Sequence, residues 1–212
     1  MDACCEQKTE TLQILREAHR KVLVVVLFIN AFLFVVEAGA GLLAQSTALL
    51  ADSLDMLGDS LVYGFSLYVL WRNAEWRAMA AVLKGVVMAA FGIGVLAEAV
   101  YKATAAVVPS AETMGIVGLL VLLGNGVCFL LLYGHRSDDL NMRSTWLCSR
   151  NDIVANLSVL IAAAGVKVFD SSWPDILIGA AIAGLFLRSA FTVLHESFAE
   201  LQKSKSESET VA

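Results

Sequence analysis

Runs of apolar residues, each long enough to cross a lipid bilayer, follow one another along almost the whole chain. A membrane-spanning helix needs about 20 apolar residues, and six such runs lie at 22–44, 46–70, 78–101, 114–133, 144–166 and 174–194. With 58% hydrophobic and 17% charged residues in a chain of 212, a soluble domain has no surface on which to place them. We therefore expect an all-α membrane protein, a bundle of six transmembrane helices.

The distribution of lysine and arginine predicts how this bundle is oriented, because cytoplasmic loops retain these residues. If the N-terminus lies inside, the cytoplasmic segments contain Lys8, Arg16, Arg20, Lys21, Arg72, Arg77, Arg136, Arg143, Lys203 and Lys205. The external segments then contain only Lys102 and Lys167. We expect both termini in the cytoplasm and a tight external turn near Gln45. The inner (plasma) membrane of a bacterium is taken as the default location.

The composition divides the chain into three segments. Residues 1–20 predict a cytoplasmic N-terminal tail whose second half is a short amphipathic helix at the membrane surface. Residues 21–196 hold the six spans, and residues 197–212 have too little apolar surface to fold, which predicts a disordered cytoplasmic tail. The net charge of −5 excludes the basic surface that nucleic-acid binding requires. Four cysteines, two in the tail and two within spans, do not indicate a disulfide framework.

Two aspartates, Asp55 and Asp59, stand four residues apart inside the second apolar run. A carboxylate within a bilayer costs about 2.5 to 3.5 kcal/mol on insertion scales, so it persists where it lines a polar path or holds an ion. Residues at i and i+4 share one helix face, and Cys148 and Asp152 have the same spacing in the fifth run. If the two faces meet, three carboxylates and a thiolate converge, a set that can close a tetrahedral site for a divalent transition metal.

Other polar residues extend these two faces. Asp52 lies one turn before Asp55, and Asn156 lies one turn after Asp152, so both are expected to support the ligands. Glu37 and Asn30 in the first run are expected to face the same polar path. A hydrogen bond that packs helices together is favoured for them, with a proton relay or gate as the alternative. Asn151 points about 100° away from Asp152 around the helix and is excluded from the ligands.

A vicinal thiol pair, Cys4 and Cys5, lies in the N-terminal tail. Adjacent thiols can capture a soft metal ion and pass it on. A dispensable tail is the favoured interpretation, since chain termini tolerate change, and capture of a soft metal is the alternative.

Two long stretches of this sequence resemble those of a known family. The segment Ser46-Thr47-Ala48-Leu49-Leu50-Ala51-Asp52-Ser53-Leu54-Asp55-Met56-Leu57-Gly58-Asp59 resembles the second-helix signature of the cation diffusion facilitators. The segment from Asn141 to Asp152 resembles the beginning of their fifth helix. The resemblance covers nearly all six spans and includes Asn30 and Glu37 in the first and Trp173-Pro174-Asp175 before the sixth.

The resemblance implies a transporter and not an enzyme, one that exports divalent transition metal in exchange for protons and works as a homodimer. Carried over by position, the metal ligands are Asp55, Asp59, Cys148 and Asp152. Two departures from the family pattern stand out. The fifth-helix histidine common in the family is Cys148 here, and the cytoplasmic C-terminal metal-sensing domain of most members is absent. The expected dimer then depends on the membrane helices or the N-terminal segment.

The ligand types constrain the metal and the mechanism. A thiolate favours zinc, cadmium or softer ions over manganese and magnesium, while cobalt, nickel and mercury stay open. Ligands hold a metal only when deprotonated, so metal and protons compete, which predicts metal/proton antiport with no tightly bound cofactor. The expected partners are divalent cations, protons and the lipid bilayer. Two alternatives remain: a membrane-embedded metal-binding subunit or sensor that does not transport, and an intramembrane hydrolase with paired aspartates, for which no accompanying motif appears.

Overall fold

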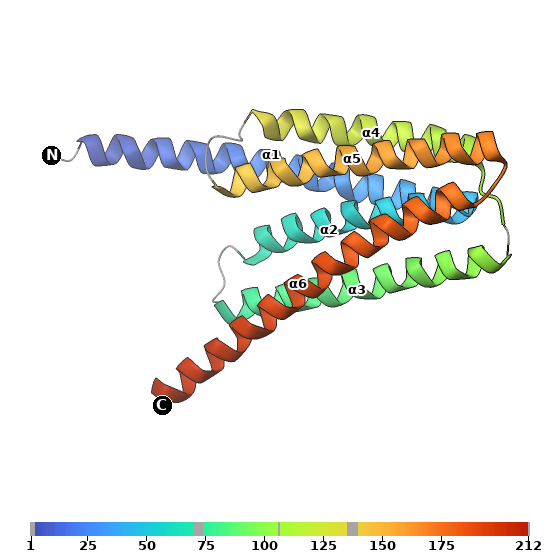
Figure 1. Ribbon diagram of the computed structural model, residues 1–212. Coiled ribbons are helices and arrows are strands. Elements are labelled where there is room, and N and C mark those ends of the chain that lie inside the picture. Colours follow the sequence, from blue (N-terminus) through green and yellow to red (C-terminus); the bar gives the residue numbers. More distant parts are fainter. Residues whose placement is uncertain (1–2, 70–73, 106, 135–139, 212) are drawn as a thin grey trace.

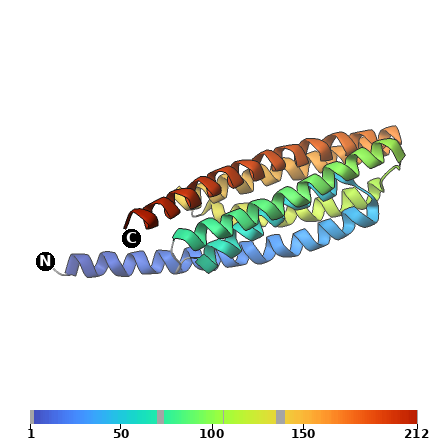
Figure 2. The same cartoon turned by 90° about the horizontal axis from the view of Figure 1, so that it is seen from below.

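The computed structural model describes residues 3–69, 74–105, 107–134 and 140–211, and these ranges fold into six α-helices (Figure 1). They are α1 (Ala3–Ala44), α2 (Thr47–Val69), α3 (Ala74–Ala105), α4 (Ala111–Tyr133), α5 (Leu140–Phe169) and α6 (Trp173–Val211). Consecutive helices run in opposite directions, and both chain ends lie at one end of an elongated bundle (Figures 1 and 2). The all-helical prediction is confirmed, whereas the cytoplasmic position of the termini stays a prediction.

Five of the helices contain a segment that is long and apolar enough to cross a membrane: 20–44, 85–105, 111–133, 149–169 and 173–195. Within its described residues α2 does not qualify, and Asp52, Asp55 and Asp59 lie close together in it. The prediction of six membrane-spanning helices is therefore confirmed for five of them, and for α2 it stays a prediction. This helix contacts α1, α3, α5 and α6, so its neighbours shield its charged face from lipid, as a polar membrane helix requires.

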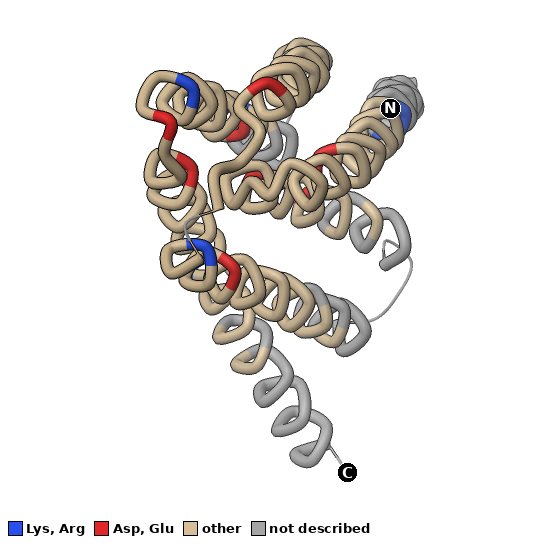
Figure 3. Tube along the Cα trace, turned by 90° about the vertical axis from the view of Figure 1, so that its right-hand side faces the viewer, with Lys and Arg blue, Asp and Glu red and all other residues tan. Residues whose placement is uncertain are grey.

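Large apolar side chains cover the outside of the bundle as well as its interior. On α1, for example, Phe28, Phe32 and Leu43 are 69%, 65% and 88% exposed. Figure 3, a view from the end that carries the α1–α2 turn, shows that few residues of the described trace are acidic or basic. Such a surface suits hydrocarbon, because lipid leaves no penalty for exposed apolar groups.

The turn between α1 and α2 is as short as the sequence predicts. Gln45 has a φ of 53°, and the amide of Ser46 donates to the carbonyl oxygen of Gly41 at 2.9 Å. A Cβ on Gly41 would lie 2.9 Å from Cγ of Leu50, so glycine permits the close approach of α1 and α2 beside the turn.

A buried carboxylate fastens the beginning of α2 to the beginning of α6. Asp175 accepts hydrogen bonds from the Ser46 hydroxyl (2.6 Å) and from the amides of Thr47 (2.7 Å) and Ala48 (3.0 Å). The first amides of a helix have no partner within it, and a negative charge there is favourable. One turn later a Cβ on Gly179 would lie 2.6 Å from the carbonyl carbon of Thr47, so the two helix starts are in backbone contact. Asp175 therefore fixes the position of the start of α2 relative to the start of α6.

The two ends of the chain are more helical than the composition predicts. α1 runs without interruption from the tail into the first span, and α6 continues to Val211. The structure gives a helix up to Val211, and the disorder expected of residues 197–212, which cannot form a core, stays a prediction. A helix satisfies its own backbone hydrogen bonds, and Leu, Gln, Lys and Glu all favour it, so it can extend without a core.

Candidate functional site

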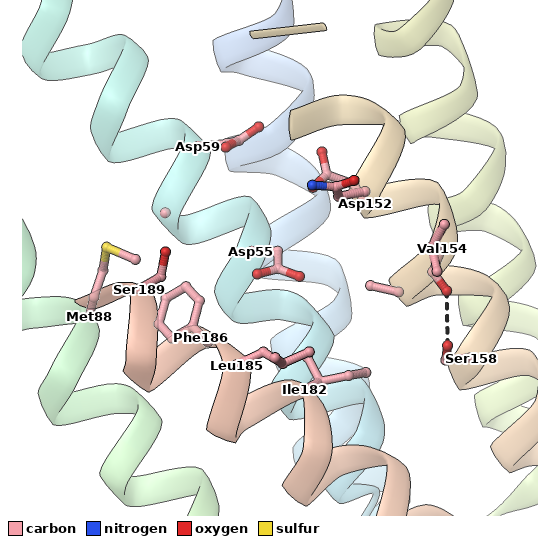
Figure 4. A pocket seen from close by; sticks show the side chains of 13 residues that line it. Asp55, Asp59, Met88, Asp152, Val154, Ser158, Ile182, Leu185, Phe186 and Ser189 are labelled. Carbon is pink, nitrogen blue, oxygen red and sulfur yellow. Dashed lines mark hydrogen bonds between the residues drawn. The ribbon is translucent and has the colours of Figure 1, made fainter. Parts of the chain in front are cut away.

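Three of the four predicted ligands line one cavity. Asp55 and Asp59 project from α2 toward Asp152 on α5 (Figure 4). The cavity has a volume of about 540 Å³ and is bounded by α2, α3, α5 and α6. The two helix faces predicted from the i,i+4 spacing therefore border the same cavity.

The rest of the cavity wall is mostly apolar. Met88 from α3 and Ile182, Leu185 and Phe186 from α6 lie opposite the carboxylates (Figure 4). The hydroxyl of Ser158 donates to the carbonyl oxygen of Val154 at 2.9 Å. Apolar walls lower the local dielectric constant and strengthen the attraction of the carboxylates for a cation.

The carboxylates share the cavity without forming a closed ligand shell. Among the side chains that the structure describes, no three His, Cys, Asp or Glu groups lie close enough together to hold a metal ion. Cys148 precedes Asp152 by one turn of α5, but its side chain lies outside the described residues. Like charges repel at short range, so a cation bound between Asp55, Asp59 and Asp152, or protons on them, would favour a closer arrangement.

A chain of buried hydrogen bonds lies beside the cavity. Asn125 on α4 donates to Oδ1 of Asn156 on α5 at 2.9 Å, and Asn156 donates to Oδ2 of Asp52 on α2 at 2.6 Å. All three side chains are at most 1% exposed. The expected positions of Asp52 and Asn156 behind the ligands thus correspond to a real contact that joins α2, α5 and α4.

Glu37 on α1 is fully buried and faces this chain. Its carboxyl group lies close enough to that of Asp52 for a side-chain hydrogen bond. With both groups ionised, however, both Glu37 oxygens and Oδ1 of Asp52 lack a hydrogen-bond partner. Glu37 therefore joins the polar interior through Asp52.

Asn30 lies at a contact between α1 and α4. Its amide donates to the carbonyl oxygen of Val26 at 3.0 Å and lies 3.9 Å from Sγ of Cys128 on α4. Both groups are buried. Of the two predicted functions of Asn30, this geometry supports a hydrogen bond between helices, and a part in a relay with Glu37 stays a prediction.

Two further asparagines belong to this region, and sequence reasoning missed the first of them, Asn125. Asn125 stands between Gly124 and Gly126 in an otherwise apolar span, and an amide in that setting is itself a signal of a polar contact between helices. Asn151 lines the cavity, and its exclusion from the metal ligands stays a prediction. The cavity is broad enough to include the residue next to Asp152.

The thiol pair in the N-terminal tail lies outside the described side chains. The backbone of Cys4 and Cys5 belongs to the first turn of α1. Their proposed capture of a soft metal stays a prediction.

Comparison with known proteins identifies the chain. A family model described as the cation efflux transmembrane domain matches residues 23–202, which include both the Asp55/Asp59 and the Cys148/Asp152 pairs. The chain belongs to the cation efflux family. This result confirms the resemblance to the cation diffusion facilitators. With five helices apolar enough to span a bilayer, this family member is an integral protein of the bacterial inner membrane.

Curated relatives of this cation efflux protein are bacterial. It is 29% identical over 201 residues to the zinc transporter ZitB of Yersinia pestis, an alignment that covers 88% of this chain and 64% of the relative. It is 27% identical over 198 residues to a cadmium, cobalt and zinc/H⁺-K⁺ antiporter of Bacillus velezensis, with 85% and 62% covered. The chain thus spans less than two thirds of these relatives.

Proposed function

We propose that this cation efflux protein exports a divalent transition metal from the cytoplasm in exchange for protons. The observation that carries the proposal is the convergence of Asp55, Asp59 and Asp152 on one cavity inside the bundle. Carboxylates in the interior of a membrane protein mark ion paths. The names of the relatives, which include zinc, cadmium and cobalt, indicate the class of ion.

The proposed ligands are Asp55, Asp59, Cys148 and Asp152. A metal bound between the three carboxylates attracts each of them and outweighs their mutual repulsion. The metal itself therefore stabilises the closed arrangement. The thiolate of Cys148 favours zinc or cadmium over manganese and magnesium. Asp52 and Asn156 hold the helices that carry the ligands in register.

Exchange for protons follows from the ligand types. Carboxylates and a thiolate bind metal only when deprotonated. A cavity open to a proton-rich compartment therefore releases metal and takes up protons, and one open to the cytoplasm does the reverse. With the termini inside and a homodimer as the working unit, this alternation exports metal.

The test is transport by purified protein in liposomes that contain a metal-sensitive dye. We expect uptake of zinc and cadmium to rise when the liposome interior is more acidic than the outside, so that protons flow outward as metal flows inward. We expect uptake to be lost in Asp59→Ala. The matched control is Glu112→Gln, which removes an exposed carboxylate in the first turn of α4. Uptake that ignores the pH gradient contradicts antiport.

The same preparation separates the alternative function. A metal-binding subunit or sensor binds zinc at these residues in calorimetry but leaves the dye inside the liposomes unchanged. Binding without uptake in the wild-type protein would replace the transporter proposal with that one.

A further inference from the structure

The Glu37–Asp52 pair is a group of buried acids that the metal cavity does not use. Both side chains are 0% exposed, and neither is among the residues that line the cavity. They come from neighbouring helices, α1 and α2. Two adjacent carboxylates in a membrane interior need a compensating cation, because unpaired charge is costly there.

The hydrogen bonds around the pair favour a different protonation state for each of its two members. Asn156 donates to Oδ2 of Asp52 and is itself held by Asn125. This donor favours Asp52 as the ionised acceptor and leaves Oδ1 free. No described group donates to either oxygen of Glu37, so Glu37 is the member that needs a proton of its own.

A single proton can join the two carboxyl groups and give Oδ1 of Asp52 a donor. On Glu37, it forms an O–H donor to Oδ1 of Asp52, and the two carboxyl groups already lie within hydrogen-bonding range. Neither acid has a salt-bridge partner among the described side chains that would neutralise it instead. The titratable groups that face the pair are Asp55 on α2 and Asp152 on α5, and both are acidic.

We propose that Glu37 and Asp52 form a proton-binding site, separate from the metal ligands, that carries a proton exchanged for metal. This inference rests on the proposed function and says where the proton that is exchanged for metal binds. When a divalent metal enters between Asp55 and Asp152, its charge repels the proton, which leaves the Glu37 oxygen for bulk water. When the metal departs, a proton from the other compartment returns to the same oxygen.

Electrostatics couples the two sites without a shared ligand. Asp52 lies three residues before Asp55, a rise of about 4.5 Å along the helix. At such a distance in a poorly solvated interior, a divalent cation and a proton strongly disfavour each other. Mutual exclusion of metal and proton is the requirement for antiport.

The experiment counts the protons released when metal binds. Full-length protein in nanodiscs is titrated with Zn²⁺ in buffers of different ionisation enthalpy, so the heat reports protons per metal. Compared with the wild type, Glu37→Gln is expected to release about one proton fewer. Glu112→Gln, the exposed control, is expected to match the wild type, and in liposomes Glu37→Gln is expected to lose stimulation by the pH gradient while it still takes up zinc.

A second variant shows whether the proton is shared. Asp52→Asn keeps an oxygen that accepts from Asn156 and is expected to show the same loss of one proton, and combining it with Glu37→Gln is expected to cause no further loss. Unchanged proton release in both single variants, or folded Glu37→Gln that no longer binds zinc, would overturn the inference. If Glu37→Gln does not fold, Asp52→Asn alone decides between these results. A wild type that binds zinc but moves none fails the proposed function instead, so the two failures are distinguishable.

Discussion

Buried carboxylates occur in two regions of this bundle, and their surroundings are opposite. At the turn end, Asp175 accepts three hydrogen bonds from the start of α2, and both of its oxygens are used. Deeper in the bundle, both oxygens of Glu37 and one of Asp52 have no partner, and Asp55 and Asp152 face a cavity. Sequence alone does not separate these acids, since each lies in a helix of the bundle.

The difference lies in what completes each group. The donors that complete Asp175 belong to the protein and are always present, so this acid stabilises one arrangement of α2 and α6. Under the proposed function, the unpaired acids of the interior gain a partner only when a metal or a proton binds. Satisfied acids are therefore expected to control folding, and unsatisfied ones transport.

The largest effect is expected from removing an acid of the cavity. Asp152→Ala should lower metal uptake by more than the 10- to 100-fold typical of outer positions around a metal. The unfolding temperature should stay the same or rise, because Asp152 repels its acidic neighbours and makes no described hydrogen bond whose loss would destabilise the fold. Uptake in liposomes and thermal unfolding in detergent measure the two quantities. Wild-type uptake by this variant would show that the cavity is not the metal path.

The opposite pattern is expected for the acid at the turn. Asp175→Ala should reduce the free energy of unfolding by about 3 kcal/mol, because it removes the capping acceptor of α2 and leaves buried donors unpaired. Uptake per folded molecule should change little. Asp175→Asn retains one acceptor oxygen and should cost less than the alanine variant. A stable Asp175→Ala protein that fails to transport would show that Asp175 acts in transport, and the distinction between stabilising and transporting acids would then be wrong.

A smaller loss of stability is expected from crowding the same contact. Gly179→Ala places a Cβ 2.6 Å from the Thr47 carbonyl carbon, and overpacking of this kind costs about 1 to 3 kcal/mol. Gly184 on the same helix has open space around its Cβ position, so Gly184→Ala is the matched control and should leave the unfolding temperature unchanged or slightly higher. Equal effects of the two substitutions would mean that contact between α2 and α6 does not hold the turn end together.

Sequence patterns predict one of these regions better than the other. The i,i+4 pairs lead directly to Asp55, Asp59 and Asp152, because helical periodicity alone puts each pair on one face. The three bonds to Asp175 and the contact of Glu37 with Asp52 depend on how α1, α2 and α6 lie against one another, which no single helix encodes. The polar character of α2 was visible as its aspartates, but only the tertiary contacts show that four helices shield it.

The smallest effect is expected from the residue that distinguishes the metal. In Cys148→His, the ratio of cadmium to manganese uptake should fall by about tenfold, equivalent to about 1.4 kcal/mol, because imidazole is a harder ligand than thiolate. Cys128→Ser removes the thiol beside Asn30 and should leave the ratio unchanged, which separates ligand chemistry from a general loss of sulfur. The acids of the cavity attract any divalent cation. If the ratio of cadmium to manganese uptake is unchanged in Cys148→His, these acids alone determine the selectivity, through the geometry of their closed arrangement.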